Sequence, residues 1–420
     1  MPTLHAIRSR FPALGAPFAF LDNAGGTQVP RDLIDAVTRT YTHEFGQLGG
    51  FYPASELAAA TIARAHNTVS TFLNAHDTGH VMLGASSTSL IHLVANAHAD
   101  ALASGDLPRA RNRVIVSTIG HEANIHPWMR LASRGFEIVP WHHTITRDSR
   151  GDAQATLTAA SLAPLLDDRA LLVVFPEVSN IIGEVYDAPA ITRAAHAVGA
   201  RTVVDAVASA PHRLPDVAAN GHDWYVYSTY KVFGPHAAAM YGSFDAFAPL
   251  TGPNHYFIPR EKLPYKFELG GFSHESAAAI ASLNTYLRFL ADANDSTSDR
   301  AAMSAAYARI DALERELAAP LLNFLGSRDD VTLYGGAAMN ASRVATISFR
   351  ARKRSSHDIA RELTAKGLGI KHGDFYSRRL IESLGMNPDD GVVRISLAHY
   401  NEGEEIERVV ARLGEALGIR

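Results

Sequence analysis

The chain has 420 residues, of which 47% are hydrophobic and 20% charged, so it can bury a large core and form two domains. Its formal net charge of −4 argues against nucleic acid or an anionic membrane as a partner, because binding either requires a concentrated basic surface. There is no cysteine, so disulfides, thiolate metal sites and a cysteine nucleophile are excluded, and no metal site is predicted. No apolar run reaches the ~18 residues of a membrane span, and residues 1–12 lack the apolar centre of a signal peptide, so we expect a cytoplasmic protein.

In chain order, the sequence predicts helices and strands that alternate through its first two thirds. Helices are expected over residues 4–11, 31–45 and 55–74, then a first core strand at 81–84. Further strands are expected at 114–117, 136–139, 171–175, 201–205, 223–227 and 237–242, with helices after residue 121 and over 157–166. This alternation favours a mostly parallel sheet covered by helices on both faces. Beyond it we expect helices over 276–293 and 297–326, and strands near 331–334, 344–349 and 392–397.

One predicted loop carries a single lysine between a strand and a Gly-Pro turn. The strand at 223–227 is aromatic and β-branched, as suits a buried strand, and it delivers Lys231 to a loop at its carboxyl end. The preceding strand, 201–205, ends on Asp205. A lysine amine forms a Schiff base, the internal aldimine, with pyridoxal 5′-phosphate, and an aspartate keeps the pyridine nitrogen protonated so that the ring acts as an electron sink. We therefore predict that Lys231 and Asp205 hold this cofactor.

Two other stretches have features of ligand-binding loops. Hydroxyl residues at 86–89 precede an apolar-periodic segment, and a helix amino terminus of this kind binds anions such as phosphate, although a simple N-cap has the same pattern. A glycine pair at 25–26 allows the backbone to approach a ligand closely, although a plain turn fits equally.

Together and in this order, these motifs resemble the class V aminotransferase group of fold-type I pyridoxal-phosphate enzymes, and within it the cysteine desulfurase-like branch. The resemblance covers nearly the whole chain, including residues 20–30, 121–128, 178–180, 201–205, 228–235 and 393–396. It implies an α/β fold with a mostly parallel, seven-stranded-type sheet in a large pyridoxal-phosphate-binding domain and a smaller C-terminal α+β domain. The expected boundaries are 1–20 for a segment that packs with the small domain, 21–290 for the large domain and 291–420 for the small domain.

The resemblance also implies roles for individual residues. Catalysis is expected from Lys231 and from His121, whose ring would stack on the cofactor and move protons. The expected cofactor contacts are Ser87, Thr88, His121, Asn180, Asp205, Ser228, Tyr230, Lys231 and, from the neighbouring subunit, Gly271. The expected substrate contacts are Asn23, Ala24 and Arg394, the last because a guanidinium pairs bidentately with an α-carboxylate; the alternative for Arg394 is a surface position on an edge strand.

The chain departs from the family pattern at four places. Where desulfurases carry the cysteine that receives sulfur, residues 371–377 contain no thiol, which excludes a persulfide-forming desulfurase. Gly270 and Gly271 stand where Gly-Thr is usual, so backbone amides would replace a hydroxyl. Ala208 replaces a Gln or His, and Tyr230 replaces the His that precedes the lysine in desulfurases. These changes affect proton transfer and leave the cofactor prediction intact.

Three functions stay open for an amino-acid substrate. A lyase that removes a β-substituent, often by breaking a carbon–sulfur bond, needs only Lys231 to take the α-proton. An aminotransferase or epimerase uses the same lysine, and a non-catalytic cofactor-binding protein is disfavoured because Asp205, Lys231, His121 and Arg394 are all present. We favour the lyase because the chain resembles the thiol-free branch, and we expect a homodimer from the loops at 49–50 and 270–271. Aromatic residues at 51–52, 256–257 and 376 do not specify the substrate side chain.

Overall fold

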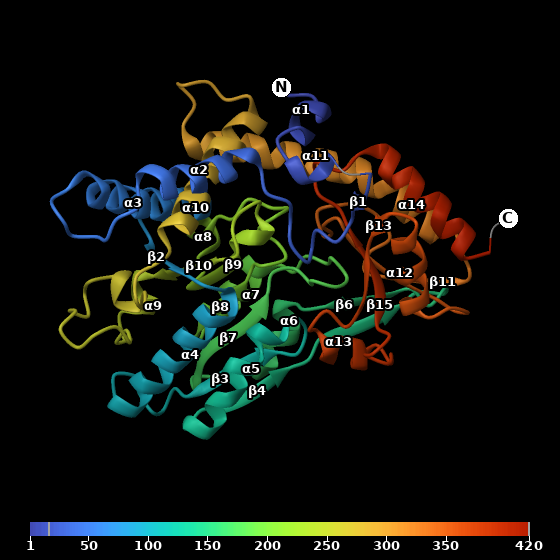
Figure 1. Ribbon diagram of the computed structural model, residues 1–420. Coiled ribbons are helices and arrows are strands. Elements are labelled where there is room, and N and C mark those ends of the chain that lie inside the picture. Colours follow the sequence, from blue (N-terminus) through green and yellow to red (C-terminus); the bar gives the residue numbers. More distant parts are fainter. Residues whose placement is uncertain (16, 419–420) are drawn as a thin grey trace.

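The computed structural model describes residues 1–15 and 17–418, and a seven-stranded sheet forms its centre (Figure 1). In spatial order its strands are β2 (Gly79–Gly84), β10 (Ala238–Ser243), β9 (Trp224–Ser228), β8 (Arg201–Asp205), β7 (Ala170–Pro176), β3 (Arg113–Ser117) and β4 (Glu137–Trp141). Strand β10 runs antiparallel to both of its neighbours, and the other adjacent pairs are parallel. The predicted mostly parallel sheet is therefore confirmed.

Successive residues of the central strands pack into two different hydrophobic cores, one on each face of the sheet. In β7, Val173 joins one core and Val174 the other, and in β8 Val204 and Val203 divide in the same way. The first core also contains residues of α3 (Pro53–Leu73), α10 (His274–Ala291) and α11 (Asp299–Gly326), and the second those of α4 (Ser87–Ser104) and α5 (His126–Met129). Because side chains alternate across a strand, burial on both faces produces the continuous apolar runs seen in the sequence.

A second sheet has six strands and joins two distant parts of the chain. Its order is β14 (Lys371–Gly373), β15 (Val392–Ser396), β12 (Thr346–Ala351), β11 (Val331–Tyr334), β6 (Ala153–Thr156) and β5 (Thr144–Arg147). The hairpin of β5 and β6 was not predicted, and it extends this sheet across the expected boundary at residue 291. The expected helix over 157–166 is shorter, consisting of α6 (Ala159–Leu162) and a 3-10 turn at Ala163–Leu165.

The remaining helices lie around the two sheets (Figure 1). They are α1 (Leu4–Arg8), α2 (Arg31–His43), α7 (Ala188–His196), α8 (Val217–Asn220), α9 (Phe244–Phe247), α12 (Ser356–Ala365), α13 (Arg378–Ser383) and α14 (Gly403–Ala416). Of these, α2 packs on α10 and not directly on a sheet. A short strand, β1 (Ala19–Phe20), pairs in parallel with β13 (Leu368–Gly369) and so ties the amino-terminal segment to the C-terminal part. No helix among the described residues has the length and apolarity needed to cross a membrane.

Candidate active site

Asp205 and Lys231 lie at the carboxyl ends of two neighbouring parallel strands. Asp205 is the last residue of β8, and Lys231 ends the 3-10 turn that follows β9. A hydrogen bond from Gly234 N to Thr229 O (2.9 Å) closes the turn, and a Cβ at Gly234 would lie only 2.7 Å from that oxygen, so glycine is required there. Parallel strands of an open α/β sheet present their carboxyl ends to one crevice, which is the usual ligand site of such folds.

Burial makes the Lys231 amine easier to deprotonate. Lys231 is 7% exposed, and its pKa falls from 10.5 to about 8, first because of burial and then because of the Arg394 guanidinium. The carboxylates of Asp205 and Asp22 act in the opposite direction. Burial in turn raises the pKa of Asp205, although the Val207 N–H (3.0 Å from Oδ1) and the Lys231 ammonium oppose this. An amine that loses its proton more readily than an ordinary lysine and a carboxylate that would be stabilised by a cation are therefore held together.

His121 is a neutral imidazole with a defined orientation. Its pKa falls to about 4, first through burial and then through the positive charges of Lys231 and Arg394, with Asp374 opposing. The backbone N–H of Ala123 donates to His121 Nδ1 (3.1 Å), so this nitrogen is an acceptor and the proton of the neutral ring is on Nε2. The His121 ring is thus held by the Ala123 N–H and presents its own Nε2–H as a hydrogen-bond donor.

The amino terminus of α4 lies beside the end of β9. Ser86 caps the helix by accepting from Ser89 N (3.1 Å), and Ser87 and Thr88 occupy the first turn. Ser228 Oγ donates to Ser87 Oγ (3.1 Å), which joins the strand end to the helix start. The first backbone N–H groups of a helix lack intrahelical acceptors and favour an anion, so this is a suitable phosphate position.

Tyr230 packs against a loop from the amino-terminal part of the chain. Its ring stacks on His236 (centroids 4.8 Å apart), and its carbonyl accepts from Thr27 N (3.0 Å). The backbone of Gly26 packs so closely against the Tyr230 ring that a Cβ at this position would lie only 3.3 Å from it. In the same loop, Ala24 N donates to Ser396 Oγ (2.8 Å).

Arg394 is buried on an interior strand of the second sheet, next to its edge strand β14. Strand β15 lies between β14 and β12, and Arg394 is 3% exposed, so the alternative of a surface arginine on an edge strand is wrong. Its Nη1 donates to Asn180 O (3.0 Å) and its Nη2 pairs with Asp22 Oδ1 (2.7 Å). The ring of Phe375 lies 3.8 Å from the guanidinium carbon. Asn180 thus meets Arg394 through its backbone, while its side chain donates to Phe375 O (3.0 Å) and accepts from Ser377 Oγ (2.7 Å).

Sequence reasoning did not predict the fixed loop that holds Phe375 and Tyr376. Both residues have positive φ angles, 48° and 59°, which bulky side chains rarely adopt. The loop is held by Asn180 Nδ2, which donates to Phe375 O (3.0 Å), and by Glu122 N, which donates to Tyr376 O (2.8 Å). The Tyr376 ring lies 5.1 Å from that of His121. The aromatic character of residue 376 was visible in the sequence, but its contact with His121 depends on residues far apart in the chain.

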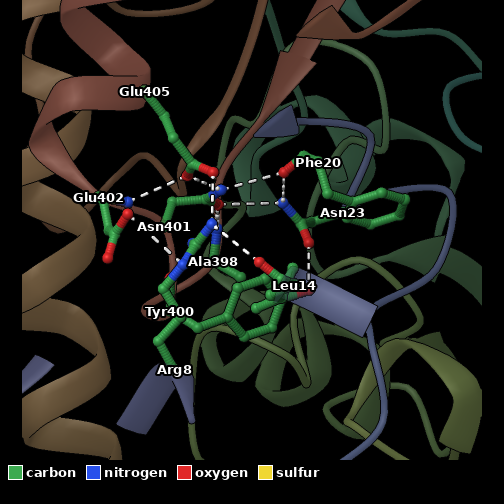
Figure 2. A network of polar contacts seen from close by, with 9 residues as sticks. All are labelled: Arg8, Leu14, Phe20, Asn23, Ala398, Tyr400, Asn401, Glu402 and Glu405. Carbon is green, nitrogen blue, oxygen red and sulfur yellow. Dashed lines mark hydrogen bonds and ion pairs between the residues drawn. The ribbon is translucent and has the colours of Figure 1, made fainter. Parts of the chain in front are cut away.

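The Asn23 side chain, expected to contact substrate, is instead buried among protein groups (Figure 2). Its Nδ2 donates to Ser396 O (2.8 Å) and Asn401 Oδ1 (3.2 Å), and its Oδ1 accepts from the Tyr400 hydroxyl. Asn401 donates onward to Phe20 O (3.0 Å). The side chain therefore positions the 22–28 loop, and a substrate contact of Asn23 stays a prediction.

The network continues to both ends of the chain (Figure 2). Asn401 Nδ2 donates to Glu405 Oε2 (2.8 Å), and Arg8 Nη2 donates to the other oxygen of this carboxylate (2.8 Å). Arg8 Nη1 also donates to Tyr400 O (3.0 Å). Helices α1 and α14 are thereby connected to the loop that carries Asp22 and Asn23.

Gly271 lies apart from these residues within one chain. It lines a cavity of about 670 Å³ together with Ser89, His236 and residues along α4, and neither Lys231 nor Asp205 lines this cavity. Gly270 and Gly271 have φ angles of +74° and +78°, which glycine adopts without strain.

Comparison with known proteins identifies the family. The family model for class V aminotransferases matches residues 19–409, and the chain belongs to this family. It is 33% identical over 418 residues to the aminotransferase-like protein FGM3 of Gibberella zeae, covering 98% of both chains. It is 30% identical to the cysteine desulfurase-like protein ustD of Aspergillus flavus, covering 98% of this chain and 90% of the relative.

A solved structure shows the same fold. The cysteine desulfurase of Thermococcus onnurineus superimposes with a TM-score of 0.83 at 21% identity, covering 99% of this chain and 98% of the other. The predicted family, fold and cofactor are confirmed: the protein is an enzyme of a pyridoxal-phosphate-dependent family with a fold-type I architecture.

Proposed function

We propose that this protein is a pyridoxal-phosphate-dependent lyase that removes a β-substituent, of the carbon–sulfur type, from an amino acid. One observation carries the proposal: a buried, readily deprotonated Lys231 stands beside Arg394 in a chain of 420 residues without cysteine. A lysine suffices for α-proton removal, whereas persulfide formation on the enzyme requires a thiol. The proposal therefore separates this protein from the cysteine desulfurases that it resembles.

The residues around Lys231 suit the cofactor. When bound, pyridoxal phosphate supplies the electron sink that stabilises negative charge at the substrate α-carbon. Lys231 Nζ would hold the cofactor, Asp205 would face its ring nitrogen, and the amino terminus of α4 with Ser87 and Thr88 would hold its phosphate. The remaining proposed contacts are His121, Asn180, Ser228, Tyr230 and Gly271 of the partner subunit.

Arg394 is proposed to bind the substrate carboxylate. A guanidinium has five N–H donors, and the structure shows two of them engaged, by Asn180 O and Asp22 Oδ1. Terminal N–H groups are thus left for a second carboxylate. Ala24 lies in the adjoining loop and, because its N–H is already donated to Ser396 Oγ, would border the substrate through its side chain. This would place the substrate α-carbon within reach of Lys231, whose Nζ takes the α-proton as the bond to the leaving group at the β-carbon breaks. The leaving group departs with the bonding electrons, and keto acid and ammonia are the remaining products after hydrolysis.

Transamination is the second candidate, because an aminotransferase or an epimerase uses the same lysine; non-catalytic binding is a weaker third. The test is turnover of amino acids bearing a β-leaving group with no keto acid added. Sustained release of ammonia and keto acid supports elimination, whereas strict dependence on an added keto acid supports transamination and contradicts the lyase. Lys231→Ala should abolish turnover, and Lys262→Ala, a change on the 251–266 loop, is the matched control.

A homodimer is proposed for the assembled enzyme, and a cytoplasmic location stays a prediction. The last turn of α2 and the loop after it expose several large aromatic or apolar side chains: Tyr41, Phe45, Leu48, Phe51 and Tyr52. The rings of Tyr41 and Phe45 stack (centroids 5.6 Å apart), and exposed apolar side chains gathered in one segment are typical of a protein interface. This segment supports an assembly in which a second copy covers these residues and supplies its Gly271 loop.

A further inference from the structure

A second cleft, of about 560 Å³, lies where β6 meets the turn before α7 and the loop before β12. The apolar part of its lining consists of Leu157, Ala159, Ala160 and Val185. The charged residues of the lining are Glu184, Asp187 and Arg343. Neither Lys231 nor Arg394 lines it. The cleft is therefore separate from the candidate active site.

Glu184 is a buried carboxylate in the wall of this cleft. It is 7% exposed, and its Oε2 accepts a hydrogen bond from Ala155 N (3.0 Å). Among residues 1–15 and 17–418, no basic nitrogen lies within 4.0 Å of its oxygens. Burial raises the pKa of Glu184 to about 7, with the Ala155 N–H and the Arg343 charge opposing. A desolvated carboxyl without an ion partner is neutralised by taking up a proton, and it stays ionised where a bound cation pairs with it.

Arg343, the cation whose charge acts on Glu184, is held by backbone carbonyl groups. Its Nη1 donates to Gly336 O and its Nη2 to Thr346 O (3.0 Å), and the residue is 3% exposed. These bonds fix the guanidinium in the wall of the cleft. Of the other titratable groups there, the Tyr186 hydroxyl donates to Ala155 O (3.2 Å), and Asp187 Oδ1 caps α7 by accepting from Ala190 N.

We propose that this cleft binds a small organic cation whose N–H groups pair with the Glu184 carboxylate and whose alkyl part contacts the apolar lining. Binding a cation restores the ion partner that Glu184 lacks, and most of the desolvation cost of this carboxylate is already met in the fold. An anion would approach two carboxylates, Glu184 and Asp187, against like charge, and the lining offers one cation, Arg343, in return. The observations thus favour a cation over an anion.

The proposed site and the candidate active site share one turn of the backbone. Ser179 N donates to Glu184 O (2.9 Å), which closes the turn, and Asn180 within it accepts from Arg394 Nη1 (3.0 Å). A cation at Glu184 therefore contacts the segment that holds Arg394 from its other side. A ligand bound at Glu184 would therefore be linked to Arg394 through this turn, without taking part in the reaction itself.

The test uses the cofactor-loaded protein and N-butylguanidinium, which stays charged and does not condense with the cofactor's aldehyde. Calorimetry at pH 7 in two buffers of different ionisation enthalpy should show saturable binding with release of about half a proton per site, because a carboxyl of pKa about 7 is half protonated there. N-butylurea, the uncharged analogue, should not bind. These two measurements require no variant.

Variants then locate the site. Glu184→Gln should weaken binding by about ten- to a hundredfold, the value of one charge-assisted hydrogen bond, and should abolish proton release. Asp187→Asn makes the same chemical change at the other carboxylate of the cleft and should leave binding unchanged. Equal binding of N-butylurea, binding retained by Glu184→Gln, or no saturable binding would each overturn the proposal.

Discussion

The buried amine of Lys231 should be reactive at neutral pH. With a pKa of about 8 instead of 10.5, about 10% of this amine is uncharged at pH 7, roughly 300-fold more than for an ordinary lysine. Brief acetylation of the cofactor-free protein with acetic anhydride at a series of pH values, followed by peptide mass spectrometry, measures this directly. The Lys231 peptide should reach half of its maximal rate near pH 8.

Two substitutions test the cause of the shift in opposite directions. Arg394→Gln removes a nearby positive charge, so the midpoint for Lys231 should rise. Asp205→Asn removes a nearby negative charge, so the midpoint should fall. A midpoint near 10 in the unchanged protein, or the same direction of shift in both variants, would refute the electrostatic reasoning.

Lys266 is the internal control, because it is also buried but differently held. Its Nζ donates to three backbone carbonyls, those of Asn254 (2.8 Å), His255 (2.9 Å) and Ile258 (2.9 Å). All three ammonium protons are thus engaged, and we expect slow acetylation. Borohydride reduction of the cofactor-loaded protein should likewise fix the cofactor to Lys231; a label on Lys266 would show that the site is wrongly assigned.

Three further predictions concern binding, stability and assembly. Arg394→Ala should lower kcat/KM for any amino acid that is turned over by about ten- to a hundredfold, the kinetic equivalent of roughly 1.5–3 kcal/mol; an unchanged kcat/KM would exclude a carboxylate contact. Asn23→Ala should lower the free energy of unfolding in urea by about 1–3 kcal/mol by leaving buried partners unpaired, whereas the exposed Asn67→Ala should change it by less than about 0.5 kcal/mol. Light scattering of the cofactor-loaded protein should give twice the chain mass of 45.3 kDa, and Phe51→Ser should favour the monomer; a monomeric unchanged protein with cofactor fully bound contradicts the dimer.

Much of the central sheet was predictable because its strands are buried on both faces. Burial of every residue in β7 and β9 leaves continuous apolar runs that local sequence reveals. Strands β8 and β9 are parallel neighbours, so their carboxyl ends meet at one edge of the sheet. Asp205 ends β8 and Lys231 follows β9, and the sequence could therefore assign both residues to one site. Arg394 could be named through its motif, but its burial between two strands depends on the pairing of the second sheet.

The features that escaped prediction depend on contacts between distant segments. Strand β5 is mostly exposed and polar, so it carries no apolar run, and only its pairing with β6 makes it a strand. The conformation of the loop at Phe375 and Tyr376 is imposed by Asn180 and Glu122, which lie far away in sequence. Asn23 was assigned by its motif position, and the partners that bury its side chain come from the C-terminal part of the chain.

Asp22 explains how a buried arginine can also serve a substrate. A guanidinium that is 3% exposed would be costly without a counter-ion, and Asp22 supplies one at 2.7 Å before any substrate arrives. The substrate carboxylate of our proposal would add to the remaining donors of Arg394 and would not have to replace Asp22. Because the neighbouring Asn23 is held through Asn401 and Glu405 (Figure 2), the position of this counter-ion is set by packing far from the chemistry. The amino-terminal and C-terminal segments thus hold the counter-ion of the Arg394 guanidinium, whereas the carboxyl ends of strands β8 and β9 position the Lys231 amine.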